Sequence, residues 1–337
     1  MATATLESET RTPTIPATMK AAAIDRFGPP DVLTLHTLPT PRPGPGEVLI
    51  AVHGAGVGVW DAEIRGGWWP QGKPKFPVVL GTDGAGVIVA KGTGVRRFSV
   101  GDRVWASEFI NPKGGFYAQF VAVSAEHAGL VPERLDLLHA GAAAVTGLTA
   151  LQGIDDHLGV RARETVLILG ASGAVGTLAV QFAKRKGATV IGTVRGRDAA
   201  RLVKELGADA TIDDSKDDNY AEPLRTLAPR GLDAVLALAG GDALNACLDQ
   251  IKPGGRIAYP NGVEPAPRKR PGMNLISYDA EAGPRQWARL SRATDEAKLE
   301  VPLAATLPLA RAAQAHERVE KGHMLGRVVL RVRSGNG

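Results

Sequence analysis

A glycine-rich turn between an apolar run and a helix-length segment is the feature that most clearly points to chemistry. The run Thr165–Leu169 (TVLIL) leads into Gly170–Gly176 (GASGAVG), and Ala174–Arg185 has the length of a helix. Without a side chain, Gly173 lets the backbone approach a pyrophosphate, and the free N–H groups of a helix start attract anions. The alternative is an ordinary turn that binds no ligand. The predicted pyrophosphate-binding residues are Ser172, Gly173, Ala174 and Val175.

The residues after the next apolar run bear on which dinucleotide would bind. NAD-binding enzymes usually carry an acidic residue there, which binds the ribose 2′-OH. This chain reads TVRGR from Thr193 and has no acid before Asp198. Guanidinium groups bind phosphates through paired hydrogen bonds, so Arg195 and Arg197, with Thr193 beside them, favour NADPH. The alternative is a pair of solvated loop arginines.

Short apolar strands that alternate with helices would position this turn. Each of these strands is apolar throughout, which indicates a parallel sheet covered on both faces. The expected strands are Thr165–Leu169, Thr189–Thr193, Ala210–Ile212, Leu232–Ala239 and Arg256–Tyr259. The expected helices are Ala142–Ile154, Ala174–Arg185, Asp198–Leu206 and Asp242–Gln250.

The remainder of the chain has a different pattern of apolar residues. From Met19 to about Ala140, short apolar runs are broken by glycine and proline, which is typical of a β-rich domain. The C-terminal run Arg327–Val332 is strand-like and is expected to return to that domain. The polar residues 1–18 are expected to be a disordered extension. The chain is therefore expected to form two domains. Residues 19–141 and 288–337 form the β-rich domain, and residues 142–287 form the domain with the parallel sheet.

Composition excludes several classes of protein. With 44% hydrophobic and 22% charged residues, the 337-residue chain falls in the range of globular two-domain proteins. A single cysteine, Cys247, excludes a disulfide framework and a cysteine-rich zinc site. No apolar run reaches the ~18 residues of a membrane span, and no secretory signal is recognised. We expect a cytoplasmic protein without membrane or nucleic-acid partners, and a phosphate pocket would explain part of its net charge of +5.

Several further motifs, in this order and spacing, resemble the zinc-independent quinone oxidoreductase branch of the medium-chain dehydrogenase/reductase superfamily. They are Met19-Lys20-Ala21, Asp61–Gly66 (DAEIRG), Gly81–Gly86 (GTDGAG), Gly101–Val104, Gly115–Phe120 (GFYAQF), Lys252–Arg256 (KPGGR) and Gly326–Leu330 (GRVVL). The resemblance implies an α/β fold with a GroES-like β-rich catalytic domain and a Rossmann doubly wound parallel-sheet domain. It also implies a cofactor in the cleft between them and a homodimer. The further residues that it places at the cofactor are Thr149, Ala239, Gly240, Tyr259, Asn261 and Arg327.

The zinc ligands of similar alcohol dehydrogenases have no counterparts here. Gly58 stands at the position of their cysteine, and Thr82-Asp83 stand at the positions of a histidine and a glutamate. A catalytic zinc needs about three protein ligands, so no metal site is predicted. His53, a lone histidine in a strand-like run, is interpreted as a packing residue.

The substrate side departs from the family it resembles. Quinone reductases usually carry asparagine at the position of Gly58, and some carry tyrosine at that of Glu63. Trp60, Trp68 and Trp69 crowd the same stretch, either as an aromatic pocket for a planar substrate or as core or interface residues. The candidate catalytic residues are Trp60, Asp61 and Glu63. Asp61 and Glu63 are possible proton donors, with exposed carboxylates or ion pairs to Arg65 as the alternative.

Together these features predict an NADPH-dependent reductase that acts by holding the cofactor and the acceptor in position for hydride transfer. Without a metal, it would transfer hydride to a quinone or other conjugated carbonyl, an acceptor that needs little activation. An enoyl or 2-alkenal reductase would use the same parts. A nonenzymatic nucleotide- or RNA-binding protein, with Arg327–Arg333 and Arg268–Arg270 as basic surface, is a third alternative.

Overall fold

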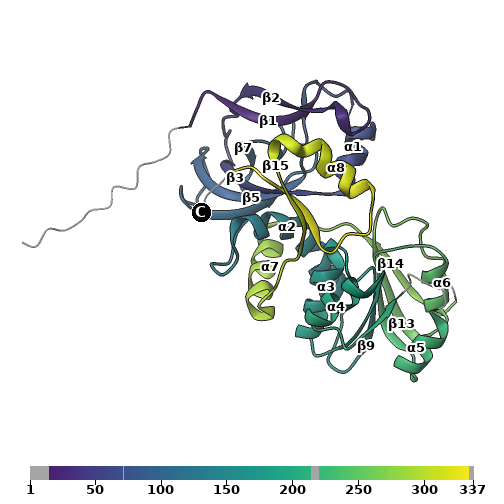
Figure 1. The fold of residues 1–337 in the computed structure, drawn as a ribbon. Helices are drawn as coiled ribbons and strands as arrows, with labels where there is room; N and C mark the ends of the chain where they lie inside the picture. The colour runs from purple at the N-terminus through teal and green to yellow at the C-terminus, as the bar shows by residue number, and fades with distance from the viewer. Residues whose placement is uncertain (1–14, 71, 214–219, 270, 334–337) are drawn as a thin grey trace, which may run out of the picture.

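The computed structural model describes residues 15–70, 72–213, 220–269 and 271–333. Two sheet-based units lie side by side in Figure 1. Strands from the first third of the chain, in purple and blue, form one unit together with the yellow C-terminal elements. The teal and green middle of the chain forms the other unit. Of the expected extension, residues 1–14 lie outside the described residues, and the first strand begins at Thr18.

The middle of the chain forms a six-stranded parallel sheet in the order β11-β10-β9-β12-β13-β14. Its strands are β9 (Thr165–Leu169), β10 (Thr189–Val194), β11 (Ala210–Asp213), β12 (Leu232–Ala237), β13 (Ile251–Pro260) and β14 (Asn274–Tyr278). Counted from β9 as the first strand, this order is 3-2-1-4-5-6, the arrangement of the Rossmann fold. The predicted doubly wound sheet is confirmed.

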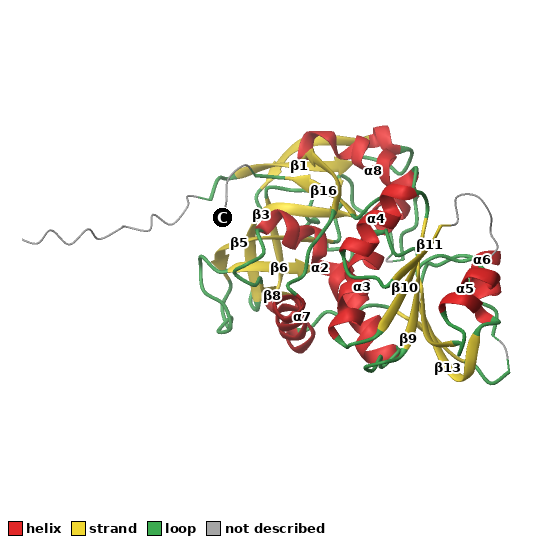
Figure 2. Cartoon of the chain, turned by 60° about the horizontal axis from the view of Figure 1, so that its bottom comes forward, coloured by secondary structure: helices red, strands yellow, loops and turns green. Residues whose placement is uncertain are grey.

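Helices cover both faces of this sheet, with α3 and α4 on one side and α5 and α6 on the other (Figure 2). These helices are α3 (Ala174–Arg185), α4 (Arg197–Glu205), α5 (Ala221–Leu227) and α6 (Asp242–Leu248). Alternate residues of β9 face opposite layers: Val166 and Ile168 join the core with α3, while Leu167 and Leu169 join the core with α5 and α6. Burial on both faces explains why the run TVLIL is apolar at every position after Thr165.

The other unit is a β-rich domain centred on β3 (Glu47–Val57). This strand pairs with β5, β7 and β16, and the sheet has the order β15-β16-β3-β5-β6-β8. The pairing of β16 with β3 brings the C-terminal run back to the first domain, as the sequence predicts. A second sheet has the order β2-β1-β4. The strands of the two sheets are β1 (Thr18–Ile24), β2 (Leu33–Pro39), β4 (Val78–Val79), β5 (Asp83–Lys91), β6 (Arg103–Ser107), β7 (Phe120–Ser124), β8 (Ala128–Leu130), β15 (Leu303–Pro308) and β16 (Arg327–Arg331).

Four helices accompany the β-rich domain and its junction with the Rossmann unit. They are α1 (Val59–Gly66), α2 (Leu137–Gln152), α7 (Pro284–Ala297) and α8 (Ala312–Glu320). The expected domain boundaries, 141/142 and 287/288, fall inside α2 and α7, and both of these helices pack against α3. With the π-helix Gly153–His157, α2 is long and apolar enough to cross a membrane by length and composition. However, 83% of its most apolar window is buried inside the protein, as in core helices.

Candidate active site

The carboxyl end of the Rossmann sheet gathers most of the predicted cofactor residues. Because the strands are parallel, the residues that follow them meet at one edge, where ligands of open α/β sheets bind. The glycine-rich turn follows β9, Arg195 follows β10, and Ala239 is the second residue after β12. Asn261 comes directly after β13. The fold thus brings together residues that are far apart in sequence.

The glycines of the glycine-rich turn have different structural roles. Gly170 has φ +72°, a left-handed conformation that favours glycine. A Cβ at Gly176 would lie 2.3 Å from the carbonyl oxygen of Gly170, so this glycine permits the close packing of α3. At Gly173, the N-cap of α3, a Cβ would meet only the Gly170 oxygen, at 3.4 Å. No side chain caps α3, so its first N–H groups are available to an anion.

Thr193 supports this turn from the neighbouring strand. Its hydroxyl accepts a hydrogen bond from the Gly170 amide at 3.0 Å, and its carbonyl accepts one from the Ala171 amide at 3.0 Å. The side chain is buried, with 3% exposed. Thr193 therefore holds the turn in place, and its direct contact with the cofactor stays a prediction.

The segment 322–326, which connects α8 to β16, lies against the same turn. The Gly326 amide donates a hydrogen bond to the Ser172 carbonyl at 2.8 Å, and Arg195 Nη1 contacts His323 Nε2 at 2.6 Å. Because a guanidinium can only donate, the imidazole nitrogen is the acceptor. His323 was not among the site residues predicted from the sequence, although it lies just before the motif GRVVL. Arg197 is exposed at the start of α4.

The other predicted cofactor residues are held by structural contacts. Thr149 donates its hydroxyl to the Val145 carbonyl at 2.9 Å, and its own carbonyl accepts from Tyr278. A Cβ at Gly240 would lie 2.3 Å from the Pro265 carbonyl oxygen, so this glycine permits the close approach of another loop. Three more residues complete the set. Asn261 Nδ2 donates to Asp279 at 2.8 Å, Tyr259 is half-buried on β13, and Ala239 is exposed after β12.

An ion pair occupies the region of Gly58. Arg327 Nη2 lies 3.1 Å from Asp83 Oδ1, and the two side chains are 12% and 1% exposed. Asp83 also accepts from the Val145 amide at 3.0 Å, and burial raises its pKa while Arg327 lowers it. A Cβ at Gly58 would lie 3.2 Å from Arg327 Nη2, so the guanidinium rests where a side chain would begin. Arg327 Nε is buried and has no hydrogen-bond partner among the residues that the structure describes.

Asp61 is buried, and its carboxylate accepts four hydrogen bonds. Oδ2 accepts from the Gly58 amide at 2.9 Å and from the Tyr117 hydroxyl at 3.1 Å. Oδ1 accepts from the Thr82 amide at 3.1 Å and the Thr82 hydroxyl at 2.7 Å. With 1% of the residue exposed, this geometry describes a residue that ties α1 to the β-rich core and does not describe a proton donor.

The network continues from Tyr117 to His316 and Arg65. Arg65 Nη1 lies 3.4 Å from His316 Nδ1, and His316 Nε2 lies 3.3 Å from the Tyr117 hydroxyl oxygen. Since Arg65 donates and Tyr117 donates onward to Asp61, one neutral imidazole tautomer satisfies both contacts. The acidic partner of Arg65 is Glu320, so the alternative in which Asp61 or Glu63 forms an ion pair with Arg65 is wrong.

We expect the buried His316 to make the protein less stable in mild acid. Burial lowers the pKa of His316 to about 4 from the ordinary 6.5. Between these values the unfolded chain binds the proton more readily, so the free energy of unfolding falls as the pH falls from 6.5 to 4, by roughly 3 kcal/mol. Urea denaturation of wild type and His316→Gln across this range measures the effect. Equal pH dependence in the two proteins would show that His316 does not carry it.

Two of the three tryptophans lie in one aromatic cluster. Trp60 lies 6.0 Å from Trp68 and 6.4 Å from Phe109, and Trp68 lies 5.8 Å from Phe109, between ring centroids. Trp69 instead packs against Phe27, at 6.2 Å. Trp69, which packs against the β-rich core, therefore fits the alternative of a core residue. The sequence analysis missed Phe109, which comes from the loop after β6.

Glu63 is the exposed acid beside this cluster. It follows Trp60 by three residues, so the two side chains lie on the same side of α1. Partial burial raises the pKa of the Glu63 carboxyl. A carboxyl with a raised pKa holds its proton at higher pH than usual, which suits a group that donates a proton.

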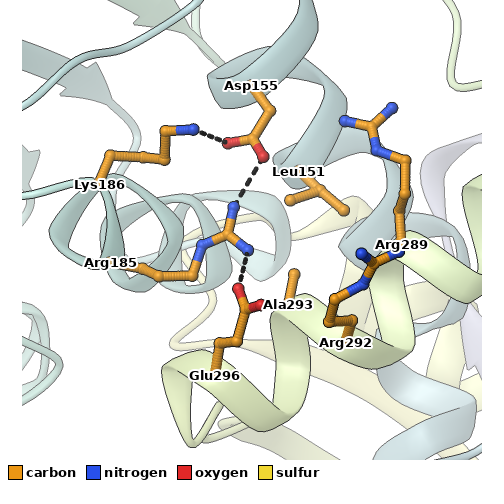
Figure 3. A pocket seen from close by; sticks show the side chains of 8 residues that line it. All are labelled: Leu151, Asp155, Arg185, Lys186, Arg289, Arg292, Ala293 and Glu296. Atoms are coloured by element: carbon orange, nitrogen blue, oxygen red, sulfur yellow. Dashed lines mark hydrogen bonds and ion pairs between the residues drawn. The ribbon is translucent and has the colours of Figure 1, made fainter.

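A separate surface pocket of about 610 Å³ lies between the π-helix, α3 and α7 (Figure 3). Some of its charged side chains pair within the pocket: Arg185 contacts Asp155 at 2.7 Å and Glu296 at 2.9 Å, and Lys186 contacts Asp155 at 3.8 Å. None of the predicted site residues lines it. The candidate active site is therefore the carboxyl edge of the Rossmann sheet and the face of the β-rich domain opposite it.

Comparison with known proteins agrees with this architecture. The alcohol dehydrogenase GroES-like domain family matches residues 44–133, and the zinc-binding dehydrogenase family matches residues 174–274. The quinone oxidoreductase of Rattus norvegicus is 32% identical over 326 residues, which cover 93% of this chain and 97% of that protein. These matches show an NAD(P)H oxidoreductase.

Solved structures give the same result. The quinone oxidoreductase from Coxiella burnetii has a TM-score of 0.83 and 31% identity, over 94% of this chain and all of that one. A mycobacterial protein solved in complex with NADPH has a TM-score of 0.81 and 30% identity, over 93% of this chain. In sequence and in fold, the chain belongs to the quinone oxidoreductase branch of the medium-chain dehydrogenase/reductase superfamily.

Proposed function

We propose that this protein uses NADPH to reduce a quinone or another conjugated carbonyl, without a metal ion. The observation that carries the proposal is the uncapped start of α3 at Gly173, with Arg195 and His323 beside it. The bound cofactor would supply a hydride to an acceptor in the cleft. The chain's own residues bind the cofactor, orient the acceptor and provide a proton.

Arg195 is the residue on which the choice of NADPH rests. It follows β10, where the 2′ substituent of the adenine ribose is bound in this fold. The position carries a guanidinium instead of an acid, which favours a phosphate over a hydroxyl. The NADPH complex of the mycobacterial relative supports this choice. Arg327, whose Nε is buried without a partner, is a further donor for the phosphates.

The donor set at the position of zinc in similar alcohol dehydrogenases supports a reaction without metal. Gly58 offers no ligand atom, and both the amide and the hydroxyl of Thr82 donate to Asp61. The remaining carboxylate, Asp83, is paired with Arg327. A Lewis acid normally activates a simple ketone for reduction, whereas a conjugated acceptor reacts with less activation. This arrangement therefore favours quinones and conjugated carbonyls.

Reduction of such an acceptor also requires a proton, and Glu63 is the proposed donor. Its raised pKa keeps a larger fraction of the carboxyl protonated, and it lies on the same side of α1 as Trp60. Trp60 in turn reaches the Rossmann domain beside Gly262. The proposal therefore places the acceptor between α1 and the end of β13.

The proposed assembly is a homodimer. Within the described part of the chain, β14 pairs only with β13, so its outer edge presents unpaired backbone groups. A second copy could add its own β14 there and extend the sheet.

Replacing Arg195 tests the cofactor assignment. A charge-assisted, bidentate contact to phosphate is worth about 1.5–3 kcal/mol, so Arg195→Ala should raise the KM for NADPH by roughly 10- to 100-fold. The KM for NADH should stay nearly constant, and the NADPH effect should shrink at high salt. Removing Arg197 as well should increase the effect.

Arg201→Ala is the matched control for this experiment. Arg201 lies on α4, is 70% exposed and pairs with Asp198, so its loss should leave both KM values unchanged. If the double substitution of Arg195 and Arg197 altered NADPH and NADH equally, the arginines would be ordinary surface charges and the NADPH assignment would be wrong.

A further inference from the structure

Three aromatic side chains form an exposed surface at the mouth of the candidate site. Trp60 comes from α1, Trp68 follows that helix, and Phe109 comes from the loop after β6. Their rings are tilted by 46° to 86° with centroids 5.8–6.4 Å apart. Trp68 is 46% exposed and Phe109 is 42% exposed. We call these three residues the aromatic wall.

The aromatic wall begins at the cofactor end of the site. A Cβ built on Gly262 would lie 3.4 and 3.5 Å from two carbons of the Trp60 indole. Gly262 comes two residues after β13, at the carboxyl edge of the Rossmann sheet. Trp60 therefore spans the two domains, while Trp68 and Phe109 extend the aromatic surface outward to solvent. A ligand on this wall would reach the cofactor at one end.

The charges around the wall disfavour an anionic ligand. Arg65, the cation of α1, is turned inward and pairs with Glu320, so the helix presents Glu63 beside Trp60. Glu108, next to Phe109, pairs with His127 at 2.7 Å. The surface is thus apolar and aromatic, with an acid at its margin. A flat, uncharged ring system is the ligand that such a surface recognises.

We propose that the aromatic wall selects acceptors with fused planar rings over single-ring acceptors of the same size. The inference rests on the proposed function, which supplies the reaction: a hydride, carrying two electrons, passes from the reduced cofactor to the quinone. One further proton, from Glu63 or water, completes the hydroquinone. The wall contributes affinity and orientation through ring contacts that a non-fused acceptor cannot make as fully.

Two quinones with the same numbers of carbon and oxygen atoms provide a matched test. 1,4-Naphthoquinone has two fused rings, whereas tetramethyl-1,4-benzoquinone has one ring with four methyl groups. Their dissociation constants are measured by calorimetry in the presence of NADP⁺, so that no hydride is available and binding is read apart from turnover. We expect wild type to bind naphthoquinone more tightly. Trp68→Ala and Phe109→Ala should each reduce this preference, by about 3- to 10-fold.

Phe76→Ala is the matched control, because Phe76 is 40% exposed and makes an edge-to-face contact with Phe27, outside the wall. It should keep the wild-type preference, and Trp68→Phe should restore most of it. If wild type showed no preference, or if Trp68→Ala and Phe109→Ala kept it, the wall would not select acceptors, although the proposed reduction could still stand. If binding followed the expected pattern but no quinone oxidised NADPH, the proposed function would fail and the wall would remain a binding site.

Discussion

Replacing Gly173 by valine is expected to weaken NADPH binding by about 100-fold while the protein stays folded. The backbone at Gly173 has φ −75°, which valine can adopt, and a Cβ there meets only the Gly170 oxygen at 3.4 Å. The added methyl groups would cover the first N–H groups of α3. Losing hydrogen bonds to a charged pyrophosphate costs about 1.5–3 kcal/mol for each bond, which gives this magnitude. Equilibrium binding of NADPH, with thermal unfolding in parallel, measures both effects.

Gly176→Val is the contrasting variant on the same turn. A Cβ at this position would lie 2.3 Å from the Gly170 oxygen and 2.7 Å from the Ala171 Cα, so this change should destabilise the fold itself. Gly173→Ala should give an intermediate loss of NADPH affinity. Normal NADPH binding by Gly173→Val would mean that the dinucleotide does not lie over the start of α3.

Replacing Asp61 by alanine is expected to lower the free energy of unfolding by about 3 kcal/mol or more. The change leaves the amides of Gly58 and Thr82 and the hydroxyls of Thr82 and Tyr117 without their shared acceptor. Each buried donor left unsatisfied costs about 1–3 kcal/mol, and water entering the cavity would recover part of this. Urea denaturation at neutral pH measures the loss.

Asp102→Ala provides the matched control for Asp61. Asp102 also accepts a backbone hydrogen bond three residues away, from Ser99 at 2.8 Å, but at an exposed site. Asp102→Ala should lower the free energy of unfolding by well under half as much as Asp61→Ala. If Asp61→Ala unfolded at the same urea concentration as wild type, the carboxylate would not hold α1, and a direct role in the reaction would need to be reconsidered.

The sequence predicts the Rossmann unit well because its signals are local. Thr165–Leu169 and Ala174–Arg185 match β9 and α3 at both ends, since a fully apolar run, a glycine turn and an amphipathic segment follow one another without a break. The strand expected at Arg256–Tyr259 begins earlier, at Ile251. The sequence places its start too late because Pro253, Gly254 and Gly255 are typical of a turn. The pairing of β13 with β12 absorbs these residues through an irregularity in register.

The β-rich domain shows where local pattern fails. The helix α1 is eight residues long, begins after Gly58 and ends before Gly67, so its sequence carries little helical periodicity. Its stability comes from Asp61, whose partners Thr82 and Tyr117 are 21 and 56 residues away. Tertiary contacts of this kind cannot be predicted from the pattern of neighbouring residues in the sequence.

Part of the candidate site could also be predicted from the sequence, and part could not. The glycine turn and Arg195 follow strands in a known order, so their place at the carboxyl edge is predictable. The contact of Arg195 with His323 spans 128 residues, and that of Arg327 with Asp83 spans 244. Phe109 joins Trp60 and Trp68 from another loop, while Trp69, adjacent in sequence to Trp68, packs elsewhere. These placements depend on the assembled domains.

The most direct test of the proposed function is NADPH oxidation by protein dialysed against a strong chelator, with quinones, conjugated enals and simple aldehydes as acceptors. We predict that quinones are reduced at the same rate before and after dialysis, that NADPH is preferred to NADH, and that simple aldehydes are poor acceptors. Faster reduction of the enals than of the quinones would favour the alkenal reductase alternative. Absence of NADPH oxidation with every conjugated acceptor, or a loss of activity that zinc restores, would contradict the proposed metal-free reduction.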